Sequence, residues 1–372
     1  MSLPEDTKAV SQEPFFIVGM PRAGTTLLAR MLDCHPACAV FPEATMFRLL
    51  DYFGCAEHFT TVWQYRLWLN FLYAGFARYD DPAAWCVAKL ALNAPTYQGT
   101  TRKLVDALAE LYCQQKDAQL WSEKTPVHAL HLPELYKLYP NARLVCLMRD
   151  PKDVLTSHVT RWNAGKARDS FVFNRAASLK NYLYQLRQNN PFSADAQVWL
   201  RYEDLTQAPE PELQRICAFL GVDYDDKMLE FHQHSIMPEN LRVHHLRLEQ
   251  PLTTSRQGRY KKMFSAIQQQ MLAQFFHEEL EAFNYDLPAK VNESISISRQ
   301  FIKMYAHLGY YARRYELQLA RVKAQGRLHL LAYQLFGKQM GRWQNYNLAY
   351  SEADWCARLA TNDAKRLQQP DD

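Results

Sequence analysis

At residues 15–32 the chain reads FFIVGMPRAGTTLLARML, which predicts a strand, a tight loop and a helix in immediate succession. The wholly apolar run at 15–18 is typical of a strand that is buried on both faces of a parallel sheet. Pro21 lacks a backbone donor, and the glycines on either side of it permit unusual dihedral angles, so the strand cannot continue through the loop. Such a turn directs free backbone N–H groups and the positive end of a helix dipole at one point. The segment is therefore predicted to bind a phosphate.

The loop differs from the phosphate-binding loop of nucleotide kinases. In kinases the pattern ends Gly-Lys-Ser/Thr, where the lysine reaches the outer phosphates and the hydroxyl binds magnesium. Here Gly24 is followed by two threonines, and the cation of the loop, Arg22, precedes that glycine. This arrangement suits a terminal phosphate that is held without a metal ion.

Composition restricts the class of protein. A chain of 372 residues suggests about two domains, and 48% hydrophobic with 22% charged residues is ordinary for a globular protein. The net charge of +4 is too small to indicate a nucleic-acid partner. The eight cysteines lack CxxC spacing, which favours reduced thiols and no metal site. We expect a cytoplasmic protein, because residues 1–13 form a polar tail without a signal sequence and no apolar run is long enough to span a membrane.

Short apolar runs alternate with helical patterns from residue 15 to residue 200. Further strands are predicted at residues 38–41, 120–124, 144–148 and 196–200, and helices at 47–79, 102–114, 151–162 and 171–188, with another helix beginning at Pro126. This alternation predicts an α/β fold, a parallel sheet flanked by helices. Ligands of such sheets bind where the carboxyl ends of the strands meet helix starts. Since Glu43, Lys124 and Arg149 follow strands directly, we expect them to converge with Arg22 on one edge.

A second motif, RDPKDVLTS, occupies residues 149–157. Its acidic and proline residues are typical of a helix start. Arg149 is therefore expected at the end of the preceding strand, and Ser157 two helical turns later on the same side. A guanidinium and a hydroxyl together make a clamp for a phosphate monoester. PRAGTT and RDPKDVLTS, in this order, resemble the two phosphate motifs of the sulfotransferases that use 3′-phosphoadenosine 5′-phosphosulfate (PAPS).

The resemblance covers residues 15–285 and implies a P-loop-like fold with PAPS as co-substrate and no metal. It assigns the 5′-phosphosulfate to the first loop and the 3′-phosphate to Arg149 and Ser157. The segment YEDL at 202–205 is similar to one whose tyrosine lies near the adenine, and TSRQGRYK at 254–261 resembles a late loop that closes over the 3′-phosphate. The implied nucleotide-binding residues are Arg22, Ala23, Gly24, Thr25, Thr26, Arg149, Ser157, Tyr202, Arg256, Gly258 and Arg259.

In-line sulfuryl transfer needs a base for the acceptor and positive charge on the leaving oxygen. The resemblance assigns the positive charge to Arg22 and Lys124. Small-molecule cytosolic sulfotransferases carry Lys-Thr-His at this point, with histidine as base, whereas here Pro126 stands in its place. The chain is closer to the tyrosylprotein and bacterial-type enzymes, in which a glutamate after the second strand is the base. That residue is Glu43, although it could equally stabilise the start of a helix; His128 and His131 are the alternative bases.

The resemblance predicts transfer to a hydroxyl or amine, and it leaves protein tyrosine, sugar, lipid alcohol and small phenol open as acceptors. A nucleotide-dependent small-molecule kinase is one alternative, disfavoured by the missing Gly-Lys-Ser/Thr. A non-catalytic nucleotide-binding scaffold is the other, and the presence of Glu43, Lys124 and Arg22 together speaks against it.

Three parts of the chain are predicted: the tail 1–13, a sulfotransferase catalytic domain 14–287 and a helical extension 288–372. In the extension, apolar residues keep a four-three spacing from Ile297 to Val322, and basic residues are concentrated there. We expect a helical hairpin packed on the catalytic domain. A homodimer through a coiled coil and a contact with an anionic surface are the alternatives.

Overall fold

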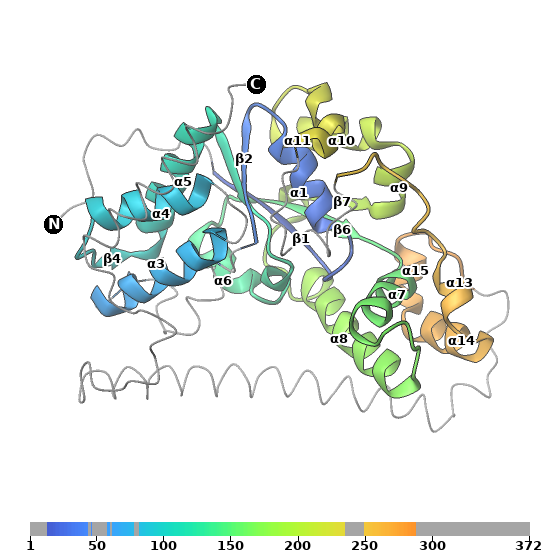
Figure 1. Ribbon diagram of the computed structural model, residues 1–372. Coiled ribbons are helices and arrows are strands. Elements are labelled where there is room, and N and C mark those ends of the chain that lie inside the picture. Colours follow the sequence, from blue (N-terminus) through green and yellow to red (C-terminus); the bar gives the residue numbers. More distant parts are fainter. Residues whose placement is uncertain are drawn as a thin grey trace, which may run out of the picture.

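The computed structural model describes residues 13–43, 46, 58–59, 62–77, 82–234 and 249–287. Its centre is a five-stranded sheet of order β2-β5-β1-β6-β7, in which every neighbouring pair is parallel (Figure 1). The strands are β1 (Phe15–Gly19), β2 (Cys38–Phe41), β5 (Leu120–Glu123), β6 (Arg143–Met148) and β7 (Gln197–Arg201). The predicted parallel α/β sheet is confirmed.

Alternate residues of β1 enter two different hydrophobic clusters. Phe15 and Ile17 face α1 (Thr25–Asp33) and α10 (Pro209–Leu220), whereas Phe16 and Val18 belong to the cluster on the other face. Both faces of the sheet are therefore covered, which is why β1 and β2 are apolar along their whole length instead of alternating.

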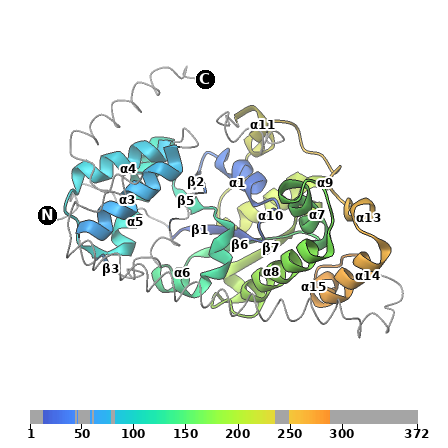
Figure 2. The same cartoon turned by 60° about the horizontal axis from the view of Figure 1, so that its bottom comes forward.

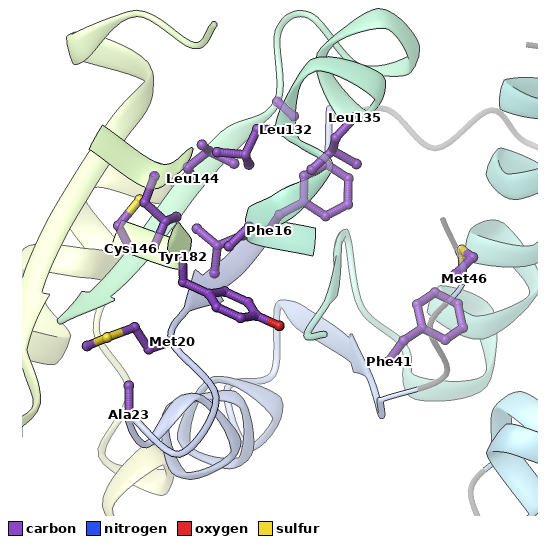
Figure 3. Packing of buried hydrophobic residues seen from close by; sticks show 14 of the residues in the cluster. Phe16, Met20, Ala23, Phe41, Met46, Leu132, Leu135, Leu144, Cys146 and Tyr182 are labelled. Carbon is purple, nitrogen blue, oxygen red and sulfur yellow. The ribbon is translucent and has the colours of Figure 1, made fainter. Parts of the chain in front are cut away.

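The second cluster extends from the sheet to the phosphate-binding loop (Figure 3). Phe16 and two residues of β6 pack there against α6 (Leu132–Leu138) and against Tyr182 of α8 (Asp169–Arg187). Met20 and Ala23 continue the same cluster beneath the loop, and neither is exposed to solvent. The loop thus rests on the core.

The helices surround this sheet. In Figures 1 and 2, α3, α4 and α5 gather beyond the β2 edge, and α13, α14 and α15 lie at the opposite end of the molecule. The remaining elements are β3 (His58–Phe59), α3 (Val62–Phe76), α4 (Pro82–Asn93), β4 (Gly99–Thr100), α5 (Thr101–Lys116), η2 (Pro126–Leu130), α7 (Pro151–Trp162), η3 (Ala194–Ala196), α9 (Tyr202–Gln207), η4 (Asp226–Glu230), α11 (Phe231–His234), α13 (Tyr260–Met263), α14 (Ala266–Phe275) and α15 (His277–Ala282).

The helix predicted to begin at Pro126 is divided into two pieces. A short 3₁₀ segment, η2, ends at Leu130, and α6 begins two residues later. Pro133 in the first turn of α6 explains the break, because it has no N–H with which to continue a helix from η2. The helices α4, α9, α10, α11, α13, α14 and α15 and the antiparallel pair β3–β4 were not predicted from the sequence.

The last described segment is anchored to the α/β body by buried polar contacts. The Tyr285 hydroxyl donates to Glu203 Oε2 at 2.7 Å, and Lys152 Nζ donates to the carbonyl of Asp286 at 3.2 Å. The predicted extension, with its apolar stripe and possible dimer contact, lies outside the described residues. Within the described part of the chain, no helix has the length and apolar character needed to cross a membrane.

Candidate active site

The order of the strands determines the order of the predicted site residues. All five strands are parallel, so the segments that follow them emerge at one edge of the sheet. Along this edge the sheet order gives Glu43 after β2, Lys124 after β5, the phosphate-binding loop after β1, Arg149 after β6 and Tyr202 after β7. The loop therefore lies between Lys124 on one side and Arg149 on the other.

A cavity of about 610 Å³ lies at this edge. Its volume is within the usual range for small-molecule sites. The predicted residues that line it are Arg22, Gly24, Thr25, Thr26, Glu43, Arg149, Ser157, Tyr202, Arg256 and Arg259. Three predicted residues do not line it: Ala23 and Lys124 are buried, and Gly258 lies in the late loop between the lining residues Arg256 and Arg259.

The phosphate-binding loop has an unusual backbone. Ala23 N donates to Met20 O at 3.0 Å, and Arg22 between them has a φ of 73°, in the left-handed region that side chains other than glycine rarely adopt. Gly24, with a φ of 111°, caps α1. A Cβ at Gly24 would lie 2.5 Å from the ring of Tyr202, so only glycine fits beneath that ring.

The candidate base and its neighbouring cation form an ion pair. Lys124 Nζ lies 2.8 Å from Glu43 Oε2 and 3.3 Å from Thr26 Oγ1. The Lys124 side chain is only 4% exposed, whereas that of Glu43 is 41% exposed. The carboxylate is thus open to the cavity, and the ammonium group lies below it, between the carboxylate and the phosphate-binding loop.

The two alternative histidine bases do not line the cavity. His128 is buried in η2, with Nδ1 2.6 Å from Oε2 of the buried Glu123. The same carboxylate accepts a hydrogen bond from the Thr125 hydroxyl. His131 is buried between η2 and α6. The geometry therefore favours Glu43 over either histidine.

Arg149 connects three parts of the site. Its Nη1 donates to Arg22 O at 3.3 Å, its Nη2 donates to Arg256 O at 3.0 Å, and its guanidinium lies 4.3 Å from the centre of the Tyr202 ring. Its Nε is buried and makes no hydrogen bond to the residues that the structure describes. A buried donor without a partner is costly, so this N–H is suited to binding an anion.

The two phosphate motifs are in direct contact. Arg22 Nε donates to Ser157 Oγ at 3.3 Å. Burial lowers the pKa of Arg22, and the positive charges of Arg161 and Arg149 lower it further, while Glu43 opposes them. The cations are crowded in a partly desolvated site, so an anion bound among them would relieve their repulsion.

The late loop is attached to α7 through Asp153. Its Oδ2 accepts from Gly258 N at 2.6 Å, and its Oδ1 accepts from Tyr260 N at 3.0 Å. These bonds hold Arg256 and Arg259 against the cavity. The sequence had indicated Asp153 only as an acidic residue in the first turn of a helix. Further lining residues that the sequence did not single out are Thr156, Trp162, Thr206, Phe231, Gln250, Pro251, Leu252 and Thr253.

Together these features define a P-loop-like α/β protein with a cationic cavity at the carboxyl edge of its parallel sheet. The particular family follows from a model described as "Sulfotransferase family", which matches residues 14–226, more than half of the chain. The chain belongs to the sulfotransferase family.

Two curated relatives and one solved structure illustrate the similarity. Protein-tyrosine sulfotransferase A of Caenorhabditis elegans is 26% identical over 230 residues, 59% of this chain and 53% of that protein. The nodulation protein NoeE of Sinorhizobium fredii is 27% identical over 235 residues, 56% of this chain and 50% of that protein. The chain thus spans about half the length of these relatives. The sulfotransferase domain of the Synechococcus PCC 7002 olefin synthase matches the structure with a TM-score of 0.49 and 22% sequence identity. The match covers 77% of this chain and 99% of that domain.

Proposed function

We propose that this chain transfers a sulfuryl group from PAPS to a hydroxyl or amine acceptor, with Glu43 as the general base. The observation that carries the proposal is the composition of the cavity at the carboxyl edge of the sheet. It joins a cationic end, with Arg22 and Arg149, to an exposed carboxylate that is paired with Lys124 at 2.8 Å.

The residues present fit the nucleotide. The buried Nε of Arg149, which has no hydrogen-bond partner among the described residues, is suited to a phosphate-bearing ligand. Arg149, Ser157, Arg256 and Arg259 would hold the 3′-phosphate. The loop residues from Arg22 to Thr26, at the N-terminus of α1, would hold the 5′ group. Tyr202 would lie near the adenine.

When bound, PAPS supplies the sulfuryl group and a phosphate as leaving group. Glu43 accepts the proton of the acceptor as the acceptor oxygen bonds to sulfur and the bond between sulfur and the bridging oxygen breaks. Lys124 and Arg22 stabilise the negative charge that develops on that oxygen. Because Lys124 also contacts Thr26, the same ammonium group can serve both the base and the leaving group.

Protein tyrosine is the first acceptor to test, because one relative is a protein-tyrosine sulfotransferase. The proposal is tested by incubating the protein with sulfur-labelled PAPS and either a tyrosine-containing peptide or a cell extract. Label should move into an acceptor with wild-type protein and not with a Lys124→Met variant. Absence of transfer to any acceptor, despite bound nucleotide, would favour the scaffold alternative.

Three further parts of the proposal concern the whole chain. Catalysis is independent of a metal ion, because the loop lacks the lysine–hydroxyl order that kinases use with magnesium. Residues 14–287 form the catalytic domain, since every residue proposed to bind the nucleotide lies within them. The chain works in the cytoplasm, in keeping with the free cysteines among the described residues.

A further inference from the structure

The peptide bond between Pro21 and Arg22 is the centre of the turn in the phosphate-binding loop. The bond from Ala23 N to Met20 O closes the turn, with Pro21 in its second position and Arg22, at a φ of 73°, in its third. This is the pattern of a type II turn, whose third residue needs a positive φ and is usually glycine or asparagine. An arginine there requires support from outside the turn.

That support comes from Arg149, which follows β6, and from His158 in α7. His158 Nε2 lies 3.2 Å from Pro21 O, and since a carbonyl only accepts, Nε2 carries the proton. The next carbonyl, that of Arg22, accepts from Arg149 Nη1. Consecutive carbonyls of the loop are thus each held by a buried donor.

His158 is itself held in place and kept neutral by its surroundings. Its side chain is buried in α7 and its ring lies edge-on to that of Trp162 at 4.7 Å. Burial lowers the pKa of His158 to about 4, and the charges of Arg175 and Arg22 act in the same direction. The imidazole is therefore neutral near pH 7, with one N–H, directed at Pro21 O.

We propose that His158 is a positioning residue for the 5′-phosphosulfate: its bond to Pro21 O fixes the Pro21–Arg22 peptide in the orientation that binds the anion. In a trans peptide the C=O and the following N–H point in opposite directions. With the carbonyl of Pro21 turned toward His158, the N–H of Arg22 is turned away from it, toward the anion. The inference rests on the proposed function.

The competing state is a type I turn, which arginine adopts more readily because both central residues then have negative φ. The change requires the central peptide to rotate, which would turn the carbonyl oxygen of Pro21 toward the anion in place of the N–H of Arg22. Without the bond from His158, part of the protein population would adopt the type I turn. The apparent affinity for the 5′ group would then fall in proportion to the fraction of molecules that keep the type II turn.

Two substitutions of His158 test this role. Glutamine places an N–H at about the same distance from the backbone, whereas methionine has similar length and no donor. We expect His158→Met to weaken adenosine 3′,5′-bisphosphate about five- to tenfold, the equivalent of one net hydrogen bond. Adenosine 3′-phosphate, which lacks the 5′ group, should bind within about twofold of wild type. His158→Gln should recover most of the loss. Calorimetry on the full chain, with matched thermal unfolding curves, measures these differences.

The outcomes separate this inference from the proposed function. Wild-type protein that binds no bisphosphate would overturn the proposed function and this role with it. Bisphosphate binding that His158→Met leaves unchanged, or an equal weakening of both ligands without recovery in His158→Gln, would overturn this role alone. If His158→Met does not fold, His158→Asn, whose shorter amide cannot reach Pro21 O, gives the same comparison.

Discussion

Replacing Glu43 by glutamine tests the general base with little change of shape. The Glu43 carboxylate lies 2.8 Å from Lys124 Nζ, and a glutamine amide oxygen can accept the same hydrogen bond. Lys124 would also keep its contact with Thr26 Oγ1 at 3.3 Å. The substitution therefore removes the negative charge and the ability to take a proton, while the ammonium group stays in place.

The expected effect is large on the rate and small on nucleotide affinity. A positioned general base contributes about 10²–10⁴ to the rate, so kcat should fall by about a hundredfold or more. Two charges 4 Å apart interact by about 4 kcal/mol near a protein surface and about 1 kcal/mol in water. Because Glu43 is 41% exposed and the nucleotide anion would lie farther away, bisphosphate affinity should rise by less than about tenfold.

The assay is single-turnover transfer from labelled PAPS to the acceptor that the labelling experiment identifies, with bisphosphate affinity measured in parallel. His131→Ala is the matched control and should retain its turnover. His128→Ala removes the imidazole whose Nδ1 lies 2.6 Å from the carboxylate of the buried Glu123, so its turnover must be expressed per folded molecule. A near-normal Glu43→Gln enzyme beside an inactive but folded His128→Ala enzyme would refute the reasoning.

Three further outcomes are expected. Adenosine 3′,5′-bisphosphate should bind far better than ATP in calorimetry with EDTA present; tighter binding of ATP on addition of magnesium would contradict the sulfotransferase site. Arg149→Ala should weaken binding of the bisphosphate by about 2–4 kcal/mol and binding of adenosine 5′-phosphate by only about 1 kcal/mol. The second ligand is affected only because the loop loses the hydrogen bond from Arg149 to Arg22 O. Equal losses for the two ligands would mean that Arg149 stabilises the fold and does not bind the 3′-phosphate. A chain shortened to residues 1–288 should still bind the bisphosphate; if it is folded by circular dichroism but does not bind, the proposed domain boundary is wrong.

The sequence predicted the strands of the sheet and not their order. Apolar runs such as 15–18 and 144–148 identify strands buried on both faces, and their parallel arrangement follows from the helices between them. The strands of the sheet are short and mostly apolar, and their residue pattern does not indicate that β5 separates β2 from β1. That neighbour relation places Lys124 between Glu43 and the phosphate-binding loop.

The site residues that the sequence indicated are those that follow strands directly. The role of Asp153 was missed because its partners, Gly258 N and Tyr260 N, are backbone groups more than a hundred residues away, and backbone groups leave no sequence signal. His158 was missed for the same reason, since its partner is the carbonyl of Pro21. Residues that touch a ligand tend to fall in motifs, whereas residues that hold a loop are recognised only once the chain is folded.

Arg149 shows why an arginine suits the point where the two loops meet. A guanidinium has five N–H donors in a fixed plane, and here two of them are used by the carbonyls of Arg22 and Arg256. The others, including the buried Nε, are left for an anion. A lysine at this position would supply the same charge, but its three donors radiate from one nitrogen and could not reach both carbonyls and a phosphate in this geometry. The residue that would bind the 3′-phosphate is thus also the one that joins the late loop to the 5′ loop, so the two ends of the nucleotide site are built as one unit.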